Sequence, residues 1–111
     1  MKMIKVRIVR NQEGFIREFD ITGHAGYAKS GSDIVCAAVS AIAYTAVGAL
    51  EELAGIRGFS EEDGHMRCVM PEGVPGSKQE IARVILETMA IGLKQVQYSY
   101  KKYVTVLDEE V

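Results

Sequence analysis

The sequence predicts an α+β fold, a sandwich in which two helices pack on a largely antiparallel sheet in the order ββαββαβ. Three observations lead to this prediction. Short segments with an apolar residue at every second position occur in adjacent pairs, as in β-hairpins. Two longer segments carry apolar residues at helical spacing. The length of 111 residues is that of one domain, so we expect a single domain over residues 1–111.

Two β-hairpins are expected. Apolar and charged residues alternate over residues 4–9 and again over residues 15–22, and the intervening Asn-Gln-Glu-Gly of residues 11–14 is typical of a turn. The second hairpin extends from Phe59 to Met70. Its tight turn is supplied by Asp63-Gly64, because these residue types tolerate the backbone that a two-residue turn requires.

The first helix is expected over residues 33–53, with Ser32 or Asp33 as its N-terminal cap. Apolar residues occupy nearly all of its sides. A helix of this kind must be covered on all sides. We therefore expect a second sheet or a partner subunit over the part that one small sheet leaves open.

A second, more amphipathic helix is expected from about Ser77. Ser77 and Glu80 have the spacing of a capping box, in which each side chain satisfies a backbone N–H group of the other residue. Residues 103–107 are rich in β-branched and aromatic side chains and predict a last strand. The acidic residues 108–110 are expected to form a solvated tail.

Composition excludes several classes of function. The net charge of −2 and the scattered basic residues give no basic face, so direct nucleic-acid binding is not expected. The first ten residues lack the apolar stretch of a signal peptide, and the uncharged residues 34–50 are short and weakly apolar for a membrane span. Two cysteines without a CxxC pair indicate neither a zinc site nor a disulfide framework. We expect a cytoplasmic protein without a metal or cofactor.

Cys36 and His24 are the candidate catalytic residues. Cys36 falls in the first turn of the expected first helix, where unpaired N–H groups and the helix dipole favour a thiolate. The same N–H groups could stabilise an oxyanion. His24 follows the second strand and could reach back over the start of the helix, and the ordinary pKa of histidine suits proton transfer near neutral pH.

Each of these residues also has a structural interpretation. A cysteine in an Ala- and Val-rich helix is commonly a buried small apolar residue. Asp33 could orient His24 or simply cap the helix, and Ser40 could support the site or donate to a helix carbonyl. Cys68 lies at strand spacing on the predicted core face, where it would be unreactive packing.

The segment between His24 and the helix is expected to be a mobile substrate loop. Residues 25–32 contain two glycines, Gly26 and Gly31, and only Tyr27 could anchor them. Ser32 ends the segment. We expect this loop to fold over a bound peptide and exclude water from the acyl-enzyme step.

Two segments together resemble the signature of the ribosomal-processing cysteine protease family. They are Gly23-His24-Ala25 and residues 31–40, which read GSDIVCAAVS. The family is also similar in length and in its ββαββαβ order, so the resemblance spans the whole chain, although its specific part is residues 23–40.

The resemblance implies a bacterial endopeptidase that removes the N-terminal extension of a large-subunit ribosomal protein. It implies Cys36 as nucleophile, His24 as general base, supporting positions at Asp33 and Ser40, and a homodimer. Two alternatives stay open at this stage: a non-enzymatic dimeric module that binds the ribosome, and a thiol hydrolase with a different substrate.

Overall fold

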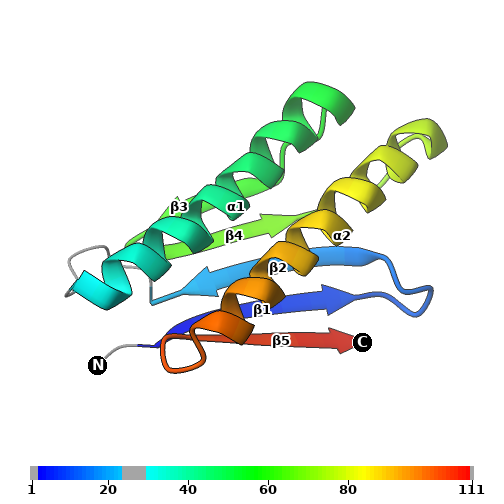
Figure 1. Ribbon diagram of the computed structural model, residues 1–111. Helices are drawn as coiled ribbons and strands as arrows, with labels where there is room; N and C mark the ends of the chain where they lie inside the picture. Colours follow the sequence, from blue (N-terminus) through cyan, green and yellow to red (C-terminus); the bar gives the residue numbers. More distant parts are fainter. Residues whose placement is uncertain (1–2, 24–29, 111) are drawn as a thin grey trace.

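The structure, a computed structural model, describes residues 3–23 and 30–110, with helical side chains described from Ile34 onward. Its elements are β1 (Ile4–Arg10), β2 (Ile16–Thr22), α1 (Ser30–Ala54), β3 (Phe59–Glu62), β4 (His65–Val69), α2 (Gly76–Ser99) and β5 (Val104–Glu110). The strands form one sheet in the order β3-β4-β2-β1-β5, and both helices lie on the same face of it (Figure 1). β1 pairs with β5 in parallel and the other pairings are antiparallel. The predicted α+β class and element order are confirmed.

Both predicted hairpins are present. In the first, β1 pairs with β2, and the Asn11 side-chain oxygen accepts hydrogen bonds from the backbone N–H groups of Glu13 and Phe15 in the turn. In the second, Asp63 and Gly64 have φ values of 48° and 77° between β3 and β4. Two successive positive φ values are what a type I′ turn requires, which explains the Asp-Gly pair.

The core lies between the sheet and the two helices. Each strand contributes alternate residues, because successive side chains point to opposite faces of a sheet. Each helix contributes residues three or four apart. The fully buried large side chains are Phe19, Ile8, Ile21, Leu50, Met66, Leu93, Val6, Val35, Val39, Val104 and Cys68.

The expected cover of α1 by a second sheet is wrong for the described residues, and the alternative cover by a partner subunit stays a prediction. The strands of the described part form one sheet, so no second sheet lies over α1. One flank of α1 packs against α2, while its outer side stays open: Ile34 is 62% exposed and Leu53 is 59% exposed. Small residues make this arrangement possible, because alanines such as Ala37 and Ala41 leave little apolar area on the outer side.

The apolar length of α1 also differs from the expectation. Residues 34–54 form a helical stretch that is long and apolar enough to cross a membrane by length and composition alone. The expectation counted only the uncharged residues 34–50, whereas the apolar stretch continues past Glu51 and Glu52 to Ala54. The core helix of a globular protein meets the same criterion, and here Val35, Val39 and Leu50 are buried against the sheet.

The start of α2 does not use the predicted capping box. The helix begins at Gly76 after Pro75, so Ser77 already lies inside its first turn, and no side chain caps it. The backbone N–H groups of Lys78 and Gln79 donate instead to the carbonyl of Pro75 at 2.9 Å. Proline fixes the backbone just before the helix, which sets the start without a serine cap.

The acidic residues 108–110 belong to β5 and are not a solvated tail. β5 pairs with β1 along its whole length, from Ile4 opposite Val104 to Arg10 opposite Glu110. Asp108 is held by Arg10 and Lys94, whose nitrogens each lie 2.7 Å from one of its oxygens. These basic partners come from β1 and α2, far away in the sequence, so local composition could not reveal them.

Candidate active site

Cys36 lies on α1 but not in its first turn. The helix begins at Ser30, so Cys36 is its seventh residue, and the expectation based on a start near Asp33 is wrong. Serine and glycine have weak helix propensity, which is why residues 30–32 resembled a loop. A long, well-packed helix can still include them, since glycine costs only about 1 kcal/mol relative to alanine.

This shift changes the electrostatic argument. The N–H groups without an intrahelical acceptor are those of the first four residues, 30–33. They precede Cys36 by roughly 4.5 to 9 Å along the helix axis, given a rise of about 1.5 Å per residue. The dipole of the helix still favours negative charge at this end. The nearest unpaired N–H group, however, lies three residues, almost one full turn, before Cys36.

Ser32 and Asp33 lie within α1, so neither is the N-terminal cap. Their side chains are not described, and the orienting role of Asp33 stays a prediction. Gly31 likewise has helical backbone and does not belong to a loop. His24, Gly26 and Tyr27 lie outside the described residues.

Cys36, Ser40 and Tyr44 follow one another in steps of four residues and therefore occupy one flank of α1. Cys36 is half-buried and packs against the core, and Ser40 is also half-buried. The Tyr44 hydroxyl, farther along this flank, donates to Glu61 of β3, with both carboxylate oxygens 2.7 Å away. The flank that carries Cys36 therefore faces the β3 edge of the sheet.

Electrostatics connects these same residues. The pKa of Tyr44 is raised, first by its hydrogen bond to Glu61, then by partial burial and the charge of Glu61. The charge of a Cys36 thiolate raises it further, so the two side chains lie within electrostatic reach of each other. Sequence reasoning missed Tyr44 and Glu61. The spacing of Cys36, Ser40 and Tyr44 could have indicated the first of them.

The end of β2 lies at the same end of the molecule as the start of α1 (Figure 1). Thr22 is the last residue of β2 and is paired with Lys5 on one side and His65 on the other. Gly23 follows with φ of +88°, and a Cβ there would lie 2.5 Å from the carbonyl oxygen of Met3. Glycine is thus required at the position that leads into His24.

His65 and Cys68 are separate from Cys36. His65 is exposed at the start of β4, whereas its neighbours Met66 and Cys68 are buried beneath the helices at alternating positions. The side chain of His65 therefore points to the opposite face of the sheet from α1. Cys68 is 1% exposed, and burial raises its pKa to about 11, which confirms its predicted packing role. Among the described side chains, those of residues 3–23 and 34–110, no group of three metal-ligating residues occurs.

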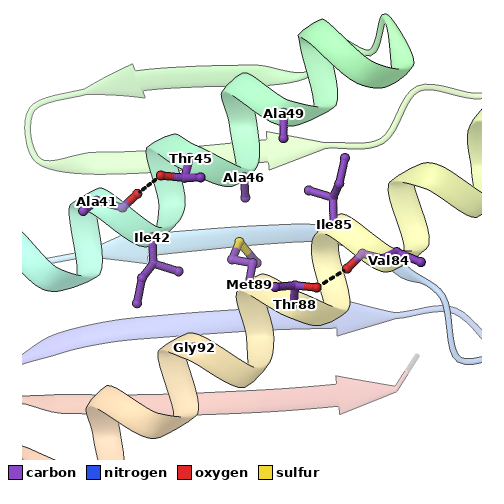
Figure 2. A pocket seen from close by; sticks show the side chains of 10 residues that line it. All are labelled: Ala41, Ile42, Thr45, Ala46, Ala49, Val84, Ile85, Thr88, Met89 and Gly92. Atoms are coloured by element: carbon purple, nitrogen blue, oxygen red, sulfur yellow. Dashed lines mark hydrogen bonds between the residues drawn. The ribbon is translucent and has the colours of Figure 1, made fainter.

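An apolar groove of about 470 Å³ lies between α1 and α2, on the other flank of α1 (Figure 2). Its hydroxyl groups, on Thr45 and Thr88, donate to the helix carbonyls of Ala41 and Val84 at 2.7 Å. The groove therefore offers no reactive group, and the candidate site is the flank of α1 that carries Cys36.

The comparison with known proteins matches this chain to a family. The sequence model of the family described as cysteine protease Prp matches residues 3–105. The ribosomal processing cysteine protease Prp of Bacillus subtilis is 33% identical over 102 residues, which cover 89% of this chain and 91% of that protein. The protein of the same name from Staphylococcus aureus is 32% identical over 103 residues, covering 90% and 93%.

Solved structures agree with this match. A crystal structure of the Staphylococcus aureus protease in complex with a substrate peptide superposes with a TM-score of 0.84 at 28% identity, covering 96% of this chain and 99% of that one. A second structure of that protease, with a covalently linked product peptide, has a TM-score of 0.80 at 29% identity and the same coverage. A Streptococcus mutans protein has a TM-score of 0.84 at 28% identity, covering 99% and 97%. The chain belongs to the Prp family of cysteine proteases.

Proposed function

We propose that this protease removes the N-terminal extension of a bacterial large-subunit ribosomal protein, with Cys36 as nucleophile and His24 as general base. The observation that carries the proposal is the position of Cys36, which is half-buried on the long helix α1. A related protease with the same fold has been solved with a covalently linked product peptide. The relatives are named ribosomal processing cysteine proteases, which supports a ribosomal protein as the substrate.

The proposed reaction is acyl transfer in two steps. His24 takes the thiol proton of Cys36, and the sulfur attacks the scissile carbonyl to form a tetrahedral oxyanion. The C–N bond then breaks as His24 returns the proton to the leaving amine, which leaves a thioester on Cys36. Water attacks the thioester as His24 accepts its proton. The C–S bond then breaks, the carboxylic acid leaves, and His24 returns the proton to the sulfur of Cys36.

Supporting roles are proposed for residues near this pair. Asp33 would orient His24, and Ser40, one turn after Cys36 on the same flank, would donate to a substrate group. Gly26 and Tyr27 would contact the substrate in the segment between His24 and α1. Gly31 and Ser32 would act from the first turn of α1, where unpaired N–H groups can bind the oxyanion or the substrate backbone.

A homodimer in the bacterial cytoplasm is proposed as the working form. The open outer side of α1, with Ile34 and Leu53 exposed, supports a partner subunit as its cover. Light scattering at micromolar concentration should give twice the mass of the chain. A monomer under these conditions would contradict the dimer without affecting the proposed chemistry.

Incubation with the extended ribosomal protein tests the substrate. Mass spectrometry should show one product that lacks a short N-terminal peptide, and a version of the ribosomal protein without the extension should stay intact. Cys36→Ala and His24→Ala should each abolish cleavage, while Cys68→Ala should retain it. Binding of the ribosomal protein without any shortened product would favour the non-enzymatic alternative, although membership in a protease family weighs against it.

A further inference from the structure

Tyr44 is an aromatic side chain that is fixed in place and yet open to solvent. Its hydroxyl donates to Glu61, both of whose carboxylate oxygens lie 2.7 Å away. Its ring packs against Phe59 in a T-shaped arrangement, with ring centroids 6.1 Å apart and an interplanar angle of 75°. Even so, 45% of Tyr44 is exposed. Because β3 holds the ring at two points, little conformational freedom is left to lose when a ligand packs against it.

The position of this ring relative to Cys36 matters as much as its fixation. Tyr44 lies eight residues after Cys36 on the same flank, about 12 Å farther along the axis at 1.5 Å per residue. Helical side chains tilt toward the N-terminus, so the tyrosine ring leans back toward Cys36. The effect of the Cys36 charge on the pKa of Tyr44 agrees with this approach.

We propose that Tyr44, held by Glu61 and Phe59, forms one wall of the peptide-binding site beside Cys36 and binds an apolar side chain of the substrate. An extended peptide advances about 3.3 Å per residue, so the bound side chain belongs to a residue two to four positions from the scissile bond. The inference rests on the proposed peptidase function and adds a specificity-determining residue to it.

Glu61 and Phe59 are positioning residues in this account, because they act through the ring of Tyr44. Tyr44→Phe keeps the aromatic surface but loses the hydrogen bond, so it should retain part of the binding effect. Glu61→Gln keeps an oxygen that can accept from the hydroxyl and should retain most of it. Tyr44→Ala removes the ring, and Tyr44→Leu keeps packing against Phe59 without an aromatic face.

The first test uses alkylation of Cys36 and needs no peptidase activity. The probes are iodoacetamides that carry a phenyl group on spacers of increasing length, compared with iodoacetamide itself. The phenyl reagent whose spacer reaches the Tyr44 ring should label wild-type Cys36 between about twofold and tenfold faster than iodoacetamide does. Tyr44→Ala and Tyr44→Leu should lose this preference while reacting normally with iodoacetamide. Tyr98→Ala is the matched control, since Tyr98 is 77% exposed on α2.

The second test uses a peptide substrate. Tyr44→Ala should raise KM about tenfold, corresponding to the loss of one well-packed aromatic contact, and should leave kcat within about twofold. A general loss of folding would instead lower the apparent kcat and leave KM unchanged, and the thermal melting curve and the iodoacetamide rate identify it. If wild-type protein cleaves no peptide, the proposed function fails, while the phenyl preference still decides the role of Tyr44. An equal phenyl preference in wild type, Tyr44→Ala and Tyr44→Leu would overturn the inference.

Discussion

Arg10 of β1 and Asp108 of β5 form a two-pronged ion pair between neighbouring strands. The Arg10 Nε lies 2.7 Å from Oδ1 of Asp108, and its Nη2 lies 3.0 Å from Oδ2. The same guanidinium also donates to Glu87 on α2 and to the carbonyl of Gly14. One arginine thus joins the last strand, the second helix and the first turn.

The first prediction concerns the pH dependence of this pair. Hydrogen bonds from Arg10, and to a smaller extent from Lys94, lower the pKa of Asp108 from 3.8 to about 2. A depressed carboxylate pKa stabilises the fold fully above the unfolded value, and this contribution is lost as the pH falls through the folded value. Asp108→Asn should therefore lower the free energy of unfolding by about 2 kcal/mol at neutral pH. In urea titrations the difference from wild type should shrink between about pH 5 and pH 2. A difference that does not change with pH would contradict this role.

The second prediction separates the two cysteines. Cys36 is half-buried, whereas Cys68 is 1% exposed and burial raises its pKa to about 11. Because the thiolate is the reactive form, iodoacetamide at pH 7.5 should label Cys36 in the folded protein and Cys68 only after unfolding. Peptide mapping by mass spectrometry measures both rates. Equal rates in the folded protein would show that the packing of Cys68 is looser than described.

The third prediction compares two glycines with the same φ of +88°, Gly14 and Gly23. A Cβ at Gly14 meets nothing within 4 Å, but at Gly23 it lies 2.5 Å from the carbonyl oxygen of Met3. Gly14→Ala should cost about 1 kcal/mol of stability from backbone strain alone, and Gly23→Ala should cost more, about 2–4 kcal/mol. Gly23→Ala should also lower turnover, because its clash displaces the chain that leads into His24. Similar stability and activity in the two variants would contradict the steric argument.

Local sequence patterns predicted the fold well. The alternation in β1 and β2 and the Asp63-Gly64 turn depend on neighbouring residues, so they could be recognised without tertiary information. The start of α1 could not, because residues 30–32 have weak helix propensity and the packing of the rest of the helix extends it to Ser30. The role of Asp108 was hidden for a related reason, since its partner Arg10 is 98 residues away.

The candidate site was predicted in part. Cys36 stood out by residue type and by the motif around it, and its half-buried position on α1 is compatible with a nucleophile. Tyr44 and Glu61 were missed because their contact joins a helix to a strand 17 residues later, and nothing in the local pattern of β3 indicates it.

The attack of Cys36 on a peptide carbonyl is tested most directly by trapping the covalent intermediate. The protease is mixed with the extended ribosomal protein, quenched in acid within milliseconds to seconds, and digested for mass spectrometry. We predict that the peptide containing Cys36 carries the added mass of the N-terminal extension as a thioester, and that neither His24→Ala nor Cys36→Ala forms this adduct. Cleavage that persists in Cys36→Ala, or an acyl group found on Cys68 in place of Cys36, would contradict the account.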